Sequence, residues 1–161
     1  MYHTSEKVNY PVLSMEKILQ TVLTSELFSL LYGYSKYNQV LLSEPDKLKT
    51  KFHTQWGTFT FKRIPFGLIN VGATFQRAMD ITYWGLIGHS IVVHIDDVIV
   101  FLNQKFDHIR HLKKIFERCR KYGISLNPKK IIFTVSEGNV LGHIIVKSGI
   151  KADLERVKTI M

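Results

Sequence analysis

The 161-residue sequence has little cysteine and no long uninterrupted apolar run. Cys119 is the only cysteine, so the chain cannot close an internal disulfide, and its first seven residues contain no apolar signal core. The longest apolar segment, residues 91–101, is interrupted by His94, Asp96 and Asp97 and is too short to cross a bilayer. These absences predict an intracellular protein, of the cytoplasm or nucleus, without a membrane partner.

Acidic residues are also scarce relative to basic ones. The sequence has 22 Lys and Arg against 13 Asp and Glu, which gives a formal net charge of +9. This balance favours a polyanionic partner, above all nucleic acid. Hydrophobic residues make up 45% and charged residues 22%, and there are no repeats or low-complexity linkers, so one globular domain over residues 1–161 is expected.

Two adjacent carboxylates, Asp96 and Asp97, interrupt the most apolar part of the chain. The flanking runs, 91–95 and 98–101, are rich in β-branched residues, which predicts a β-hairpin with the acidic pair at its tip. Carboxylates held together beside buried strands repel each other, and a divalent cation such as Mg²⁺ would supply the counter-charge. Asp is also a common turn residue, so a solvated hairpin tip explains the same pattern. This stretch alone leaves both interpretations open.

Three segments have apolar residues at helical spacing, namely residues 15–24, 73–84 and 106–122. Asn70 is a candidate N-cap for the second, and Gly123 would end the third. The other faces of the third helix carry many Lys and Arg side chains. A solvated surface explains these charges at least as well as a nucleic acid contact does.

Apolar and β-branched runs predict strands at residues 27–31, 131–135 and 140–146, the last two as a hairpin around a turn at 137–139. Residues 40–62 predict a β-ribbon that turns at Trp56 and Gly57. With the helices and the acidic hairpin, the chain order becomes an α+β fold, the ferredoxin-like split β-α-β-β-α-β arrangement with an inserted ribbon.

That arrangement serves many functions, and two classes suit a basic chain. An RNA-recognition module stacks bases on a central strand with a basic-Gly-aromatic signature, and the sequence has no such strand. A nucleic-acid polymerase palm fits a central hairpin that presents Asp96 and Asp97, because a bound metal would let the carboxylates face phosphate.

Six stretches carry a resemblance to a known family. They are residues 32–39, 56–59, 64–80, 95–97, 126–130 and 141–144. In this order they resemble the successive motifs of reverse transcriptases from Gypsy-type LTR retrotransposons, and the long block 64–80 followed by the Asp pair is the most specific part. The resemblance implies a polymerase palm over about 27–39 and 65–146, a fingers ribbon over about 40–62, and the start of a next segment at 150–161.

The resemblance implies an RNA-directed DNA polymerase of a retrotransposon Pol polyprotein. Such an enzyme copies an RNA or DNA template from deoxynucleoside triphosphates and uses two Mg²⁺ or Mn²⁺ ions. By position, Asp96 and Asp97 match the metal-binding pair of the family. Tyr37 matches the aromatic residue under the nucleotide sugar, which excludes a ribose 2′-hydroxyl by its bulk.

The same resemblance assigns roles to further positions. Phe66, Gly67 and Gln76 match the block that lines the nucleotide pocket and template, and Lys130 matches the basic residue near the triphosphate. Leu141, Gly142 and His143 match the hairpin that supports the primer end. Taken singly, each has a plain structural explanation, such as packing for Tyr37 or a turn for Gly67. The ordered set favours the functional interpretation.

The sequence departs from the family at three positions. The first motif reads Leu-Asp-Gly in the family and Leu31-Tyr32-Gly33 here, so Tyr32 stands at the position of the third metal-binding aspartate. A phenol is neutral near pH 7 and cannot bridge two cations as a carboxylate does. Lys36 and His94 stand where the family usually has Gly and an aromatic residue. We therefore expect impaired catalysis with at most one weakly bound ion, or alternatively a non-catalytic, basic nucleic-acid-binding remnant.

Overall fold

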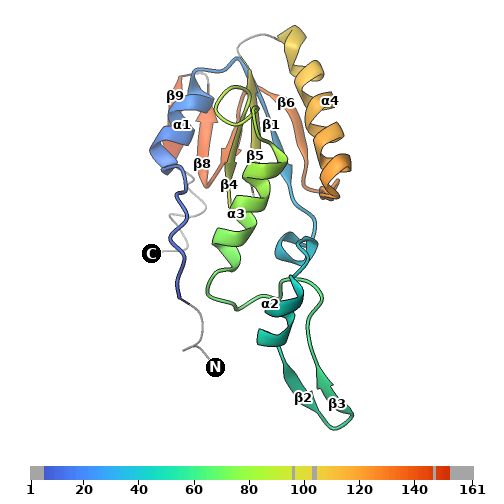
Figure 1. Ribbon diagram of the computed structural model, residues 1–161. Coiled ribbons are helices and arrows are strands. Elements are labelled where there is room, and N and C mark those ends of the chain that lie inside the picture. Colours follow the sequence, from blue (N-terminus) through green and yellow to red (C-terminus); the bar gives the residue numbers. More distant parts are fainter. Residues whose placement is uncertain (1–5, 96, 103–104, 147, 153–161) are drawn as a thin grey trace.

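The computed structural model describes residues 6–95, 97–102, 105–146 and 148–152, and a four-stranded antiparallel sheet lies at its centre (Figure 1). The strand order is β4-β5-β1-β6. The strands are β1 (Leu27–Tyr32), β4 (Ile91–His94), β5 (Asp97–Leu102) and β6 (Ile132–Val135). β4 and β5 form the predicted central hairpin, and β1 pairs along the whole of β5. Asp96, which was predicted for the hairpin tip, lies outside the described residues.

Two helices cover one face of this sheet. They are α3 (Val71–Thr82) and α4 (Lys105–Tyr122), which confirm the predictions from helical spacing to within two residues at each end. Their apolar stripes, represented by Phe75, Met79 and Ile115, pack with Leu31 and Val98 of the sheet in one buried core. The sheet and the two helices thus follow one another along the chain as β1, α3, β4, β5, α4 and β6.

A helix and a second sheet cover the opposite face. The helix α1 (Met15–Leu23) confirms the prediction for 15–24 and begins at Ser14, whose Oγ accepts a hydrogen bond from the Lys17 amide at 3.4 Å. The second sheet comprises β7 (Gly138–Val140), β8 (His143–Val146) and β9 (Gly149–Ala152). Apolar residues of α1, β7 and β8 pack on Phe28, Leu30 and Ile99 of the central sheet. The central strands are therefore buried on both faces.

The predicted hairpin between residues 131–135 and 140–146 is wrong. β6 pairs with β1, and Gly138 and Asn139, expected to lie in the turn at 137–139, belong to the strand β7, which pairs with β8. The turn falls instead on Leu141 and Gly142, whose φ angles are +52° and +82°. A two-residue turn with two positive φ angles matches the twist of an antiparallel pair, and Gly142 adopts it without strain.

Residues 40–62 form an arm that projects from the body (Figure 1). The predicted ribbon is confirmed for β2 (Phe52–Thr54) and β3 (Gly57–Phe59), which join through Gln55 and Trp56, and an isolated antiparallel bridge links Leu41 with Arg63 at its base. Earlier residues of the arm form a short helix, α2 (Glu44–Lys49), instead of a strand and loop. Ser43 caps this helix and Pro45 lies in its first turn, two features that favour helix initiation.

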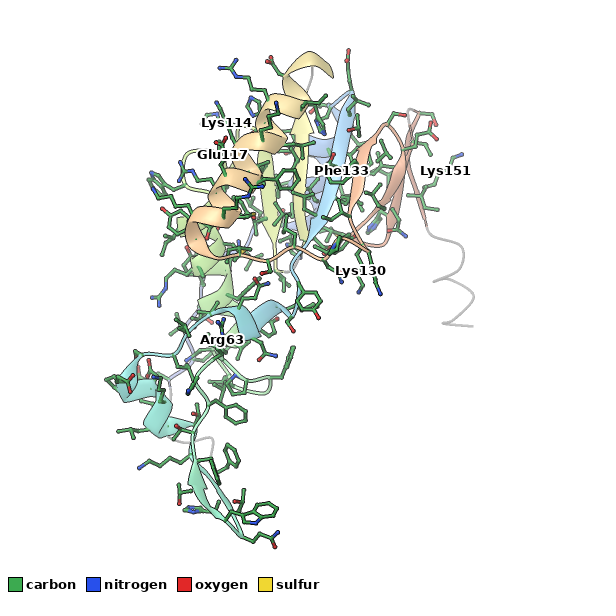
Figure 2. The ribbon with its side chains drawn as sticks, turned by 90° about the vertical axis from the view of Figure 1, so that its right-hand side faces the viewer. Arg63, Lys114, Glu117, Lys130, Phe133 and Lys151 are labelled. Atoms are coloured by element: carbon green, nitrogen blue, oxygen red, sulfur yellow. The ribbon has the colours of Figure 1, made fainter. Side chains whose placement is uncertain are left out.

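The base of the arm is tied to the body by the short 3₁₀ helix η1 (Lys36–Gln39). Arg63 donates hydrogen bonds to the carbonyl oxygens of Asn38 and Gln39 at 3.2 and 2.8 Å (Figure 2).

Asn70 stands at the N-cap position of α3 but does not cap it. Its side chain instead accepts a hydrogen bond from the Val8 amide and donates one to the Glu6 carbonyl, which holds the amino-terminal segment.

None of the helices in the described part of the chain has both the length and the apolar character needed to cross a membrane.

Candidate functional site

A pocket of about 390 Å³ opens where β1 ends beside the start of β5. Its lining residues are Tyr32, Gly33, Ser35, Lys36, Phe66, Asp97, Asn127 and Lys130. Four residues predicted from the sequence, Tyr32, Phe66, Asp97 and Lys130, thus come together from four separate parts of the chain. Ser35 and Asn127 were not singled out from the sequence, because their residue types carry no signal of their own outside the matched motifs.

The β1–β5 register places Tyr32 directly opposite Asp97. Residues that face each other across an antiparallel pair project from the same face of the sheet, so the phenol and the carboxylate share the pocket. Burial and, to a smaller extent, the Asp97 carboxylate raise the pKa of the Tyr32 phenol above its ordinary value. Tyr32 is therefore an uncharged neighbour of Asp97 at neutral pH.

The loop that carries Lys130 is fastened to the end of β1. The Asn127 amide donates a hydrogen bond to the Tyr32 carbonyl oxygen at 2.7 Å, and the Lys130 amide donates one to the Asn127 carbonyl at 3.1 Å. Two residues after Tyr32, beyond the end of β1, the Tyr34 amide donates a hydrogen bond to the Ser125 carbonyl oxygen at 2.8 Å. These bonds fix Lys130 at the end of the central sheet, beside the pocket (Figure 2).

The turn that follows β1 has an unusual backbone. Ser35 and Lys36 both lie in the left-handed region, with φ angles of +55° and +42°. This region favours glycine, because a Cβ atom there crowds the following carbonyl oxygen. The position that the resemblance marks as a usual Gly, residue 36, is thus one where this chain holds a side chain in a strained conformation.

Tyr37 lies behind the pocket and does not line it. Its ring makes edge-on contacts with the rings of Phe66 and Phe75, each with centroids 5.3 Å apart. Phe66 in turn lines the pocket. Gly67, with a φ angle of +90°, lines an adjacent groove. The structure therefore places Tyr37 where it supports Phe66 from the side of the core.

Gln76 is buried and bonds to the hairpin that carries the acidic pair. Its Oε1 accepts a hydrogen bond from the Ile95 amide at 3.1 Å, and its Nε2 donates to the Val93 carbonyl at 3.4 Å and to Asp80 at 3.2 Å. Ile95 has a φ angle of +53°, which is rare for a β-branched residue. Gln76 thus holds the turn before Asp97. A polar residue between the apolar positions 75 and 79 of a helix is the signal in the sequence for such a contact.

Leu141, Gly142 and His143 lie at the β7–β8 turn and the start of β8, and none of them lines the pocket. Leu141 packs against the core on the α1 side of the central sheet. The Gly142 amide donates a hydrogen bond to the Asn139 side chain at 3.0 Å, which fixes the turn.

Within the described residues, no group of three or more His, Cys, Asp or Glu side chains could hold a metal ion. Asp97 is the one acidic residue among the described residues that line the pocket, and it faces a neutral phenol. A pair of divalent ions needs carboxylates that bridge both of them. The described donors do not fit such a pair.

Solved structures show which fold this is. The chain superposes on a foamy viral protease-reverse transcriptase in complex with double-stranded DNA with a TM-score of 0.86 and 19% identity, over 99% of this chain and 28% of that one. For the same kind of protein in complex with an RNA/DNA hybrid, the TM-score is 0.82 at 19% identity, over 96% and 21% of the two chains. The fold, a mixed α/β arrangement, is that of a reverse transcriptase domain.

The family follows from the sequence match. The model of the reverse transcriptase (RNA-dependent DNA polymerase) family matches residues 3–145, so the chain belongs to this family. It is 36% identical over 151 residues to the retrovirus-related Pol polyprotein from transposon gypsy of Drosophila melanogaster, and 34% identical over 151 residues to that from transposon opus of the same species. It is 33% identical over 129 residues to the enzymatic polyprotein of figwort mosaic virus.

These three alignments cover 94%, 94% and 80% of this chain, but 15%, 15% and 19% of the relatives. The chain therefore spans less than a fifth of the length of the relatives that it matches. The predicted similarity to Gypsy-type Pol polyproteins is confirmed.

Proposed function

We propose that this chain is the palm, with part of the fingers, of a retrotransposon reverse transcriptase, and that its own catalysis is impaired. The palm would be the split β-α-β-β-α-β layer formed by β1, α3, β4, β5, α4 and β6, and the arm would belong to the fingers. The observation that carries the proposal is the pairing of Tyr32 with Asp97 at the mouth of a pocket that Lys130 also lines.

The partners of this site would be a template–primer of RNA or DNA and a deoxynucleoside triphosphate. The Lys130 ammonium can neutralise phosphate oxygens, and the Phe66 ring offers an apolar surface to a sugar or base. Tyr37 would act on the nucleotide through Phe66, against which its ring packs. Gln76 would keep the acidic turn in place through its bond to the Ile95 amide.

Divalent cations would supply charge neutralisation of the phosphates if the site bound them, and Mg²⁺ or Mn²⁺ would be the ions concerned. Asp97 is one candidate ligand, and Asp96, outside the described residues, is the other. Tyr32 cannot supply a bridging carboxylate, and its raised pKa keeps the phenol neutral at physiological pH. We therefore expect weak binding of one ion at most, and no detectable nucleotide transfer.

Primer extension tests this function. The chain is incubated with an RNA template, a DNA primer and deoxynucleoside triphosphates in Mg²⁺ or Mn²⁺, and duplex binding is measured in the same buffers. We expect binding that weakens with salt, with a log-log slope of about −0.9 for each phosphate neutralised on duplex DNA, and no extension. Extension by the unaltered chain would overturn the impairment, and salt-independent binding would overturn the nucleic acid contact.

The alternative is a basic nucleic-acid-binding remnant that has lost more than one catalytic group. The net charge of +9 supports binding in either case. Tyr32→Asp separates the two, because it restores a carboxylate opposite Asp97 in the β1–β5 register. Extension that appears in Tyr32→Asp, and disappears again when Asp97→Asn is added, would identify an enzyme that lost one ligand. Absence of extension in Tyr32→Asp would favour the remnant.

A further inference from the structure

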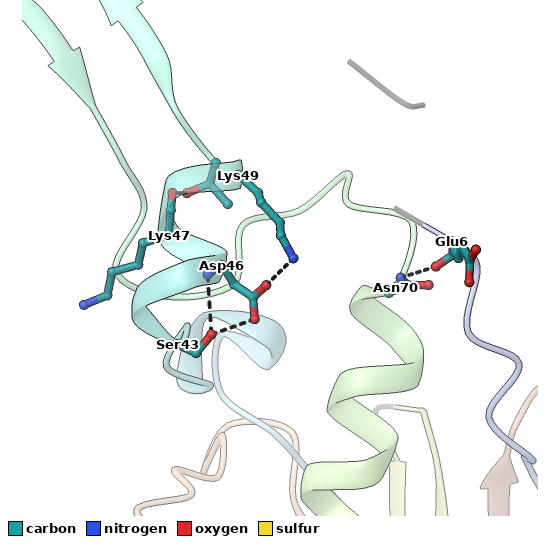
Figure 3. A network of polar contacts seen from close by, with 7 residues as sticks. Glu6, Ser43, Asp46, Lys47, Lys49 and Asn70 are labelled. Atoms are coloured by element: carbon teal, nitrogen blue, oxygen red, sulfur yellow. Dashed lines mark hydrogen bonds and ion pairs between the residues drawn. The ribbon is translucent and has the colours of Figure 1, made fainter. Parts of the chain in front are cut away.

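Residues 6–10 precede α1 in the chain and are tied to α3 by two sets of hydrogen bonds. We call them the amino-terminal strap. The first set lies at the start of α3, where the Asn70 side chain accepts a hydrogen bond from the Val8 amide at 2.9 Å and donates one to the Glu6 carbonyl oxygen at 2.8 Å (Figure 3). Because both bonds go to main-chain atoms of the strap, they fix its path along the helix.

The second tie joins one side chain of the strap to a later turn of α3. The Tyr10 hydroxyl donates a hydrogen bond to Asp80 Oδ2 at 2.7 Å. This bond is the main cause that raises the pKa of the Tyr10 phenol, and burial and the Asp80 charge add to it. The hydroxyl therefore keeps its proton at neutral pH and remains a donor. Pro11 disfavours a helical backbone at Tyr10, which keeps this end of the strap extended.

The other oxygen of the Asp80 carboxylate binds Gln76. Asp80 Oδ1 accepts a hydrogen bond from Gln76 Nε2 at 3.2 Å, and the two residues, four apart on α3, lie on one face of the helix. A carboxylate can only accept hydrogen bonds, so it selects the NH₂ end of the Gln76 amide and leaves the oxygen end for a donor. That donor is the Ile95 amide, which lies 3.1 Å from Oε1. Asp80 therefore determines which end of the buried Gln76 faces the turn.

The turn needs this support because its backbone is strained. Ile95 has a φ angle of +53°, which β-branched residues rarely adopt and which persists only where the surroundings hold it. If the Gln76 amide were turned around, its NH₂ group would face the Ile95 N–H, and two donors repel each other. The orientation of Gln76 thus bears directly on the turn before Asp97.

We propose that Tyr10 is a positioning residue of the pocket, and that it acts on the turn before Asp97 through Asp80 and Gln76. Tyr10 itself does not line the pocket, so it touches no group bound there. Its hydroxyl fixes the Asp80 carboxylate, the carboxylate fixes the Gln76 amide, and the amide holds the turn. The consequence for a bound ion rests on the function proposed for the pocket, whereas the effect on the turn does not.

The effect on the turn is measured by amide hydrogen exchange in the full chain. Tyr10→Phe keeps the ring and removes the donor, so exchange at the Ile95 amide should accelerate about threefold to tenfold, and the side-chain amide resonances of Gln76 should shift. Tyr83→Phe is the matched control, because its hydroxyl lies 3.1 Å from Cys119 Sγ, away from this chain of bonds. The amides of β1 report global unfolding in the same spectra.

The control should leave exchange at Ile95 unchanged relative to the β1 amides. Equal acceleration in Tyr10→Phe and Tyr83→Phe, or none in Tyr10→Phe, would overturn the proposal.

Conservative variants of Asp80 separate the hydrogen bonds from packing. In Asp80→Asn, the side-chain oxygen can accept from Gln76 while the NH₂ group donates to the Tyr10 oxygen, so both bonds survive. Exchange at Ile95 should then match that of the unaltered chain. Asp80→Leu keeps the bulk but removes both bonds, and exchange should be at least as fast as in Tyr10→Phe. Equal exchange in the Asn and Leu variants would contradict a chain of hydrogen bonds.

A double-mutant cycle tests whether Tyr10 acts through Gln76. In a Gln76→Met background the last bond to Ile95 is already lost, so adding Tyr10→Phe should cause no further acceleration there. If the two substitutions accelerate exchange independently, Tyr10 reaches the turn by another route and the proposed path is wrong.

The consequence for the pocket is measured separately, as Mn²⁺ affinity in chains that carry Tyr32→Asp. Adding Tyr10→Phe should weaken Mn²⁺ binding about threefold or more, and adding Tyr83→Phe should not. If Tyr32→Asp binds no Mn²⁺, the proposed function fails, while accelerated exchange at Ile95 in Tyr10→Phe still supports the role of Tyr10 in the turn. Mn²⁺ binding that Tyr10→Phe leaves unchanged would overturn the positioning role and leave the proposed function standing.

Discussion

The body and the arm of this molecule use the same kinds of residue in opposite ways. In the body, the strands β1, β4 and β5 are mostly apolar, and their central residues are buried on both faces. In the arm, several large apolar side chains are exposed, namely Leu41, Leu48, Phe52, Trp56, Phe59 and Phe61. Apolar residues therefore hold the fold together in the body, whereas in the arm they remain available for contacts.

The pocket lies where the buried body ends. β1 and β5 bring Tyr32 and Asp97 to the last residues of their pairing, and loops add Lys130 and Phe66. A rigid sheet thus fixes the positions of the first two side chains, while the loop contacts set the others. Because apolar side chains are buried in the body and exposed in the arm, a substitution in the body should change the stability of the fold. A substitution in the arm should change binding alone.

The largest effect is expected from matched leucine substitutions. Leu31→Ala in β1 removes a side chain that is 0% exposed, and cavity formation should lower the free energy of unfolding by about 2 to 5 kcal/mol. Leu41→Ala in the arm removes one that is 69% exposed and should change it by less than about 0.5 kcal/mol. Urea denaturation of both variants measures the difference. Similar losses would mean that the arm belongs to the cooperative core.

A smaller effect is expected at Gln76. Gln76→Met keeps the shape of the side chain but removes the acceptor of the Ile95 amide, which should cost about 1 to 3 kcal/mol. Gln55→Met at the exposed β2–β3 turn is the control and should be neutral. Amide hydrogen exchange at Ile95 should accelerate in Gln76→Met. If exchange there is unchanged, Gln76 does not hold the acidic turn.

The smallest effect concerns pH and the buried His108. Its Nε2 lies 2.8 Å from Ser29 Oγ, which also accepts a hydrogen bond from the Thr134 amide at 2.9 Å. Burial, and then neighbouring His111, lower the pKa of His108. The unfolded chain therefore binds more protons than the folded chain does at acidic pH. The free energy of unfolding should fall as pH drops below about 6.5, by up to about 1.4 kcal/mol per pH unit.

His111 contributes with the same sign, because burial lowers its pKa as well. His108→Gln should flatten the pH dependence in part, and His108→Gln with His111→Gln should flatten it further. His53→Gln, on the exposed ribbon, should leave it as it was. Chemical denaturation at pH 5, 6 and 7 provides the comparison. Stability that rises on acidification would contradict the account of His108.

The sequence predicted the body better than the arm, and the reason is physical. Helical spacing identified α1, α3 and α4, and the β-branched runs around Asp97 identified the central hairpin, because burial imposes those patterns. Along the arm, no buried face imposes a period. Ser43 and Pro45 started a helix there that the apolar pattern did not indicate.

The pairing of strands that are far apart in the sequence was the second feature that the sequence could not predict. Gly138 and Gly142 are both suited to turns, and only the pairing of β6 with β1 decides that Gly142 makes the turn. For the same reason, the sequence could mark Gln76 and Tyr37 as site positions but could not place them. The structure puts Gln76 behind the acidic turn and Tyr37 behind Phe66. In the sequence, only the order of the motifs relates Tyr32, Phe66, Asp97 and Lys130 to one another. The structure shows that these four residues line one pocket.

The central claim is that position 32 lacks a metal ligand. It is tested most directly by Mn²⁺ binding to the full chain, measured from the electron paramagnetic resonance signal of the free ion. Restoring a charged ligand opposite Asp97 should tighten binding about tenfold or more in Tyr32→Asp, and adding Asp97→Asn should reverse the gain. Mn²⁺ affinity that is the same with Tyr32 as with Asp at this position would contradict the account.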